Sequence, residues 1–273
     1  MTNIWRGSWV VAYREILRII QDRTRLFSSF AMPVIFLVIF GAGFNKTMGA
    51  LAPGIDFIQF LFPGIVAQTV FNNSIISGAS LVWDREFGFL RELLVAPIPR
   101  AGIVAGKIIG AAAIAMVQAF VILLLAPIVH VSLNLVLILK LIPLLALISV
   151  SLSSLGILIS TRIRSQQGFQ VMIQLIVMPM LFLSGVFFPL SNVPTWLSVA
   201  SKLNPLTYGI DAVRQLFLSD ILAQAKDIPG QQEFSLGVKV FGHTMTIFQD
   251  ACVIGIVGIV LITLATWSFN RQD

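Results

Sequence analysis

The chain has 273 residues, of which 57% are hydrophobic and only 11% are charged, and its formal net charge is +6 at pH 7. Soluble domains carry about 25% charged residues, so this composition excludes a soluble domain; non-alternating apolar runs of about 20 residues predict an all-α membrane protein rather than a β-barrel. The one cysteine, Cys252, excludes an internal disulfide, and the two histidines, His130 and His243, are too far apart in sequence to suggest a metal site.

Residues 1–25 predict an amphipathic helix that lies in the membrane interface. An arc of aromatic and aliphatic side chains faces an arc of polar ones that includes Arg14 and Arg18. Trp and Tyr at headgroup depth, with Arg facing water, are typical of an in-plane helix. Such a helix is either a plain membrane anchor or also a contact surface for a partner. The apolar arc consists of Trp5, Trp9, Ala12, Tyr13, Ile16, Leu17 and Ile20.

Residues 26–273 predict a single transmembrane domain with six spans. The second span carries several polar residues, which are costly in lipid and should face protein or a water-filled path. Hydrogen bonding between helices explains them equally well. In the third span Gly102, Gly106 and Gly110 recur every four residues and predict a close helix contact. The spans are expected at about 26–44, 60–83, 103–129, 141–159, 169–188 and 251–269.

A charge-dense segment separates the second span from the third and predicts an amphipathic helix over residues 84–96. Its charged side chains cannot lie in hydrocarbon, so we expect them in water at one membrane face, opposite an apolar stripe that packs on the spans. The alternative is a solvated cluster of ion pairs within one helix. The charged residues are Asp84, Arg85, Glu86, Arg91 and Glu92, and the stripe is Phe87, Leu90, Leu93 and Leu94.

The segment Gly102–Ile108 reads GIVAGKI and is not a phosphate-binding loop. It is one residue short, lacks a Ser or Thr after Lys107, and follows no predicted strand. Since no other nucleotide-binding motif is found, we expect the chain to have no ATP site of its own and not to be an enzyme.

Residues 189–250 are expected to form an external region whose short helices are re-entrant or lie on the outer leaflet. Apolar stripes predict one helix through Trp196 and Leu203 and another from Leu206 to Phe217. With six spans, twelve of the 18 Lys and Arg residues fall on the side of the termini and six on the other side. The excess predicts that both termini and the 84–96 helix are cytoplasmic.

The predicted spans favour neither a coupled carrier nor a membrane enzyme. Their middles contain no Asp or Glu, which ion-coupled carriers usually need, and no His/Asp/Glu cluster suggests hydrolysis. What remains is a charged helix suited to docking, which suggests that energy arrives from another subunit.

Two stretches resemble the type 2 exporter class of ABC transporter permeases, which includes drug-resistance and polysaccharide exporters. Glu86–Lys107 reads EFGFLRELLVAPIPRAGIVAGK, with Glu, then Gly, a Leu-Glu-Leu-Leu-like core, a Pro and a Gly-Lys pair. Ser184–Leu218 begins SGVFFP and contains the later Asn-Pro and a Tyr with a downstream Arg.

The resemblance implies a permease subunit of an exporter in a bacterial-type cytoplasmic membrane. A second copy, or a paralogous permease, would face it, and two separate ATP-binding cassette subunits would supply ATP and Mg²⁺. The 84–96 segment would be the coupling helix that receives ATPase closure, and the N-terminal helix would contact the same subunit. The implied contact residues are Glu86, Gly88, Arg91, Glu92, Leu93, Pro97, Arg14 and Arg18.

A transport path is expected between the second and fifth spans, lined by aromatic, methionine and amide side chains that suit an amphipathic drug, lipid or glycolipid. Packing between two copies is the alternative role for these residues, which are Phe71, Asn72, Asn73, Gln174, Met178 and Phe182. Phe187 and Phe188 are expected to close the outer end. Polysaccharide export is the nearest alternative function, followed by a passive channel, an ion-coupled carrier or a membrane scaffold.

Overall fold

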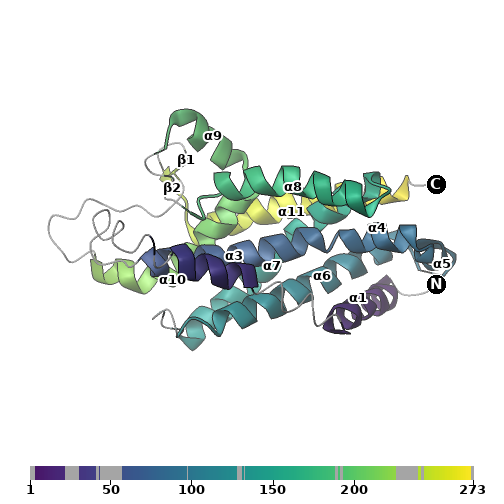
Figure 1. The fold of residues 1–273 in the computed structure, drawn as a ribbon, viewed down its shortest axis with the longest axis horizontal. Coiled ribbons are helices and arrows are strands. Elements are labelled where there is room, and N and C mark those ends of the chain that lie inside the picture. The colour runs from purple at the N-terminus through teal and green to yellow at the C-terminus, as the bar shows by residue number, and fades with distance from the viewer. Residues whose placement is uncertain are drawn as a thin grey trace.

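The computed structural model describes residues 4–21, 31–40, 43, 57–96, 98–127, 131, 133–187, 190, 193–225, 239–240 and 243–271. Its long helices run side by side along the long axis of the molecule (Figure 1). They are α3 (Phe57–Ile76), continued by α4 (Ala79–Glu86), then α6 (Arg100–Leu123), α7 (Leu135–Arg162), α8 (Gln166–Leu183) and α11 (Ile247–Asn270).

Five helical segments are long and apolar enough to cross a membrane, so the chain is an integral membrane protein. They are 58–86 and the four helices α6, α7, α8 and α11, and each overlaps a predicted span. Of the predicted first span, 26–44, the structure describes a helical segment, Ala31–Phe40, which is too short to cross on its own. The described ranges are therefore those of a mostly helical membrane protein, as predicted, whereas the sixth span and the division at residue 25 stay predictions.

The core lies between α3, α6, α7 and α10 (Pro205–Ala225), where large apolar side chains such as Phe62, Phe71 and Ile65 are fully buried. By contrast, α8 and α11 have mostly exposed apolar faces, as expected for helices at the edge of a bundle in lipid.

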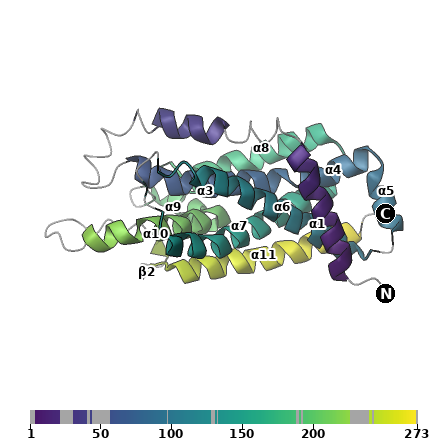
Figure 2. The same cartoon turned by 90° about the horizontal axis from the view of Figure 1, so that it is seen from below.

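One end of the bundle gathers segments that are far apart in sequence. α1 (Ile4–Gln21) crosses the bundle there at a steep angle, and α5 (Phe89–Val95) lies beyond the end of α4 (Figure 2). The C-terminal end of α11 reaches the same end, where the Arg100 Nη1 donates a hydrogen bond to the carbonyl of Asn270 at 2.8 Å. α1 thus lies across the bundle, as expected for an interface helix.

The opposite end differs from the expectation of short helices and loops. α9 (Thr195–Leu203) is short and exposed, with Trp196 70% and Leu203 82% exposed. α10, however, has 21 residues and packs on α3, α7 and α11, with almost every side chain from Leu206 to Leu218 buried. A two-stranded antiparallel hairpin, β1 (Lys239–Val240) and β2 (His243–Thr244), was also not predicted.

Candidate coupling interface

The charged segment after the second span is two helices rather than one, which corrects the helix predicted over 84–96. α4 ends at Glu86 and α5 begins at Phe89. Gly88 lies between them with a φ of +78°, a left-handed conformation that favours glycine. The single apolar stripe is therefore broken: Leu90 and Leu93 are buried, whereas Phe87 is 78% exposed.

Asp84 was expected in water, yet it is almost wholly buried in an ion-pair cluster. Its Oδ2 accepts from Nζ of Lys107 at 2.6 Å and from Nη2 of Arg14 at 2.7 Å. Glu15 lies in the same cluster, with its Oε1 2.9 Å from both Lys107 Nζ and Arg14 Nη2. Arg18 completes it from α1, at 3.5 Å from Asp84. We name these five residues, Arg14, Glu15, Arg18, Asp84 and Lys107, the ion cluster.

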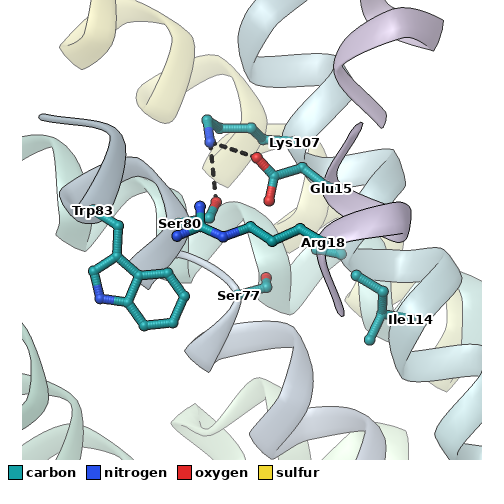
Figure 3. Close-up of a pocket in the computed structure, with 8 residues that line it drawn as sticks. Glu15, Arg18, Ser77, Ser80, Trp83, Lys107 and Ile114 are labelled. Atoms are coloured by element: carbon teal, nitrogen blue, oxygen red, sulfur yellow. Dashed lines mark hydrogen bonds and ion pairs between the residues drawn. The ribbon is translucent and has the colours of Figure 1, made fainter. Parts of the chain in front are cut away.

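The ion cluster ties three helices together. α1 supplies Arg14, Glu15 and Arg18, α4 supplies Asp84, and α6 supplies Lys107, which Figure 3 shows pointing at both Glu15 and Ser80. Buried charges must be paired, and removing one member leaves an uncompensated charge that costs about 3–5 kcal/mol. The ion cluster is therefore a specific connection between α1, α4 and α6, here called the joint, rather than a solvated surface patch.

The protonation of Glu15 reflects this environment. Burial alone would raise the pKa of this carboxyl, but the Lys107 ammonium and the Arg14 guanidinium outweigh it, and the pKa is lowered below its ordinary value. Burial likewise opposes the charged form of Arg14, yet Asp84 and Glu15 together raise the pKa of its guanidinium. Both shifts favour the ionised forms of Glu15 and Arg14.

α1 sits on α6 because the facing residues are small. A Cβ on Gly106 would lie 2.5 Å from the Ser8 carbonyl oxygen, and one on Gly110 would lie 2.8 Å from the Cβ of Glu15. The small-residue face predicted for the third span thus contacts α1. The aromatic residues Trp5, Trp9 and Tyr13 stay 56–80% exposed on the outer side of α1, where an interface helix would meet headgroups.

Two arginines of α1 also stack on aromatic rings next to Asp84. The guanidinium of Arg14 lies 4.3 Å from the ring centre of Phe89, the first residue of α5, and that of Arg18 lies 4.8 Å from Trp83 in α4. Cation–π contacts of this kind add to the ion pairs. Arg14 therefore contacts both helices that flank Gly88.

The last two charges of α4 hold the turn between α7 and α8. Arg85 Nη1 donates to the carbonyl of Ile163 at 2.6 Å, at the C-terminal end of α7. Glu86 accepts the backbone N–H of Gln166 at 2.8 Å, at the N-terminus of α8, where a carboxylate is favoured by the helix dipole. A displacement of α4 would thus reach α1, α5 and α8 together.

The remaining predicted contact residues lie along α5 or just after it. Gly88 and Glu92 are exposed, whereas Leu93 is buried and packs inward. Arg91 belongs to α5, but its side chain and the whole of Pro97 lie outside the described residues. Among the described residues of this segment, Gly88 and Glu92 are therefore accessible to a partner, whereas Leu93 is not.

The predicted path residues divide between two settings. Phe71 is fully buried in the core of the chain, and the Asn73 amide donates to the Thr69 carbonyl of its own helix at 2.8 Å. Asn72 is half-buried on α3. Gln174, Met178 and Phe182 all lie on the exposed face of α8, and Met178 and Phe182 are each 57% exposed.

The C-terminal end of α8 is held by side chains of Asn204 and of the start of α10. Asn204 Nδ2 donates to the carbonyl of Met180 at 2.7 Å, and Thr207 Oγ1 donates to that of Leu183 at 3.4 Å. Arg214, which lies in the region predicted to be external, is buried; its Nη2 donates to the Gly185 carbonyl at 2.9 Å, and its guanidinium lies 3.9 Å from the Phe60 ring centre. These bonds satisfy carbonyls that the end of a helix leaves free.

Phe187, predicted as an outer gate, follows this clamped end. Its ring centre lies 5.8 Å from those of Phe36 and Phe182 and 5.9 Å from that of Phe40. Phe188 lies outside the described residues. The aromatic cluster joins the segment Ala31–Phe40 to the end of α8.

Sequence reasoning missed Glu15 and Lys107 as partners of Asp84, and Arg214 as a buried residue. A signal did exist for Lys107, since it is a cation inside an apolar stretch and lies between Gly106 and Gly110, which bring another helix close. For Glu15 the only hint was an acid between two arginines on an amphipathic helix.

The sequence matches the family model described as "ABC-2 type transporter" over residues 7–218. It is 32% identical to ycf38 of Cyanophora paradoxa, named as a transport permease, over 77% of this chain and 73% of that protein. It is 30% identical to YbhR of Escherichia coli, named as a multidrug ABC transporter permease, over 62% of this chain and 46% of that protein. It is 28% identical to YadH of Escherichia coli, named as an inner membrane transport permease, over 67% and 72%.

Proposed function

The chain belongs to the ABC-2 type transporter family, and from this premise we propose that it is the transmembrane permease subunit of an ATP-driven exporter powered by a separate ATPase. ATP and Mg²⁺ would be bound by that partner. The observation that carries the proposal is the ion cluster, which fastens the interface helix α1 to the helix that leads into α5.

The coupling path follows from these contacts. A partner that pushes on the exposed side of α5 or α1 would move them with α4, because Arg14 contacts Asp84 and Phe89. α4 is continuous with the central α3 through a short turn, and Glu86 contacts the start of α8. A movement of α4 would thus be transmitted to both α3 and α8.

The exposed face of α8 supports an assembly of two copies around a shared path. Gln170 and Gln174, one turn apart within this span, are exposed in the single chain beside Val171 and Met178. Amide side chains are costly in lipid, so a face that carries them is better placed against protein or a water-containing path. We propose that Gln174, Met178 and Phe182 line this path, that Phe187 closes it, and that the substrate is an amphipathic or lipid-like molecule.

Reconstitution with the partner ATPase tests the function. We expect the purified chain alone to hydrolyse no ATP, and the complex in proteoliposomes to couple hydrolysis to the efflux of a fluorescent amphipathic substrate. Glu92→Lys, on the exposed side of α5, should weaken co-purification of the ATPase, whereas Lys202→Glu on α9, at the other end, should not. Substrate flux through the chain without any ATPase would refute the proposal in favour of a channel or carrier.

A further inference from the structure

A hollow opens beside the ion cluster, between α1, α4 and α6. It holds about 290 Å³ of empty space, part of it open to the surroundings. Figure 3 shows the side chain of Arg18 crossing it toward Ser80 and Trp83. Its lining residues are Glu15, Arg18, Ser77, Ser80, Trp83, Lys107, Ala111 and Ile114.

Among the residues that the structure describes, the ion cluster has one positive charge without a matching carboxylate. Arg14, Arg18 and Lys107 are three cations, and Glu15 and Asp84 are two anions. The shortest contacts belong to Lys107 and Arg14, whereas Arg18 makes the longest, at 3.5 Å, and its side chain is 39% exposed. The excess charge is therefore most available to a ligand at Arg18.

The surroundings of Arg18 select an amphipathic anion over a soluble one. Leu17 and Ile20 of the same helix are 38% and 59% exposed, and Ile76, next to Ser77, is 41% exposed. Exposed aliphatic side chains of a membrane-spanning protein can contact lipid acyl chains. Tryptophan is enriched at headgroup depth, and the Trp83 ring lies beside Arg18. An anion with an apolar tail would therefore contact both Arg18 and these aliphatic side chains.

We propose that this hollow binds the phosphate group of an anionic phospholipid, with the Arg18 guanidinium as the principal donor. The enclosed part has room for about one water-sized group, so the phosphate would lie at the mouth, against the exposed part of the Arg18 side chain. A guanidinium binds phosphate through two parallel N–H donors, which an ammonium cannot do. The bound lipid would neutralise the excess charge and fasten α1 to the membrane beside its joint with α4.

Native mass spectrometry of the purified full chain, titrated with phosphatidylglycerol or phosphatidylcholine, tests the proposal without any ATPase. We expect one phosphatidylglycerol to bind more tightly than any phosphatidylcholine, and Arg18→Gln to weaken it about tenfold, the loss of one charge-assisted contact. Arg271→Gln is the matched control, because Arg271 also stacks on a tryptophan, Trp267, at 4.1 Å, but does not line the hollow.

A second variant and a competition experiment with inorganic phosphate test the site further. Ser77→Leu fills the mouth and leaves Arg18 in place, so it should also weaken phosphatidylglycerol binding even if Arg18→Gln fails to fold. Equal binding by wild type, Arg18→Gln and Ser77→Leu would overturn the site. Displacement of the lipid by an equal concentration of inorganic phosphate would overturn the lipid as its ligand, since the apolar surroundings would then contribute nothing.

Discussion

The ammonium nitrogen of Lys107 lies 2.6 Å from a carboxylate oxygen of Asp84, with side chains that are 1% and 4% exposed. Replacing Lys107 by Met keeps the length of the side chain but removes the one cation of the ion cluster that is itself buried, so Asp84 and Glu15 keep only the partly exposed Arg14 and Arg18. We expect the free energy of unfolding to fall by about 3–5 kcal/mol, measured by thermal unfolding in detergent. Lys140→Met, at an exposed position of α7, should change it little.

A double substitution shows whether charge is the cause. Adding Glu15→Gln to Lys107→Met removes one of the two carboxylates and should restore part of the lost stability. If the double variant unfolds at the same temperature as Lys107→Met, the loss comes from packing and not from carboxylates left without a buried cation.

Acidification should loosen the joint through Glu15. Its pKa is lowered from the ordinary value of 4.5, so above pH 4.5 the carboxyl is ionised in both the folded and the unfolded chain, and its stabilisation is fully present. Below pH 4.5 the unfolded chain takes up the proton first, and the contribution disappears as the pH falls through the lower folded pKa. Unfolding temperatures from pH 7 to pH 3.5 should therefore fall less steeply for Glu15→Gln than for wild type.

The matched variant for that comparison is Glu92→Gln, since Glu92 is an exposed glutamate of α5. It should follow the wild-type profile. A Glu15→Gln profile that runs parallel to the wild type over this range would show that Glu15 is not the group responsible.

Gly106→Val should detach α1 from α6. A Cβ at this position would meet the Ser8 carbonyl oxygen at 2.5 Å and Val11 Cβ at 2.7 Å, both on α1. Because overpacking of this kind costs about 1–3 kcal/mol, we expect faster tryptic cleavage within α1, at Arg14 and Arg18. Gly255→Val is the control, since its nearest neighbour would be 3.9 Å away, and unchanged cleavage in Gly106→Val would contradict the close contact.

Gly88→Ala should impair coupling through the backbone alone. No atom lies within 4 Å of the added Cβ, but a φ of +78° costs an alanine about 1–2 kcal/mol. We expect fewer substrate molecules exported per ATP hydrolysed in proteoliposomes. Gly88→Asn is the matched variant, because Asn tolerates the left-handed region, and it should retain more of the coupling. Equal coupling in both variants and wild type would mean that coupling does not depend on the left-handed conformation at Gly88.

Arg214→Met should free the outer end of α8. The carbonyls of Gly185 and Val186 would lose a buried donor, which costs about 1–3 kcal/mol each. Hydrogen exchange of the backbone near Gly185 should rise, while exchange in α1 should not change. Arg162→Met, at an exposed position, serves as the control. Unaltered exchange near Gly185 would show that Asn204 and Thr207 suffice to hold this end.

The long helices could be predicted because uninterrupted apolar runs have no other structure in a bilayer. The interface helix followed from the aromatic arc that includes Trp5 and Tyr13. The ion cluster could not be predicted in this way, because Asp84 and Lys107 find partners on α1, up to 92 residues away in sequence, and a composition rule places every charge in water. Gly88 was noticed as part of a motif, yet only its φ shows that it divides two helices.

The prediction for α10 was also wrong, in the position of the helix. Its apolar stripe from Leu206 to Phe217 predicted a short helix that is re-entrant or lies on the outer leaflet, whereas even Asp211 and Arg214 of this helix are buried. Arg214 can be buried because its guanidinium donates to carbonyl oxygens just after the end of α8. The residues of α10 alone do not show that these partners exist. Buried polar residues of one helix are explained by the backbone of another.

The hydrogen bonds that Asn204, Thr207 and Arg214 donate to the end of α8 also have a consequence for biosynthesis. Met180, Leu183 and Gly185 leave the ribosome before Asn204, Thr207 and Arg214, whose side chains later bond to their carbonyls. Until those residues emerge, these carbonyls at the end of α8 lack the side-chain donors that bond to them in the folded protein. A nascent chain arrested before Pro205 should therefore hold α8 in a state that differs from the finished protein, and the two helices mature as one unit.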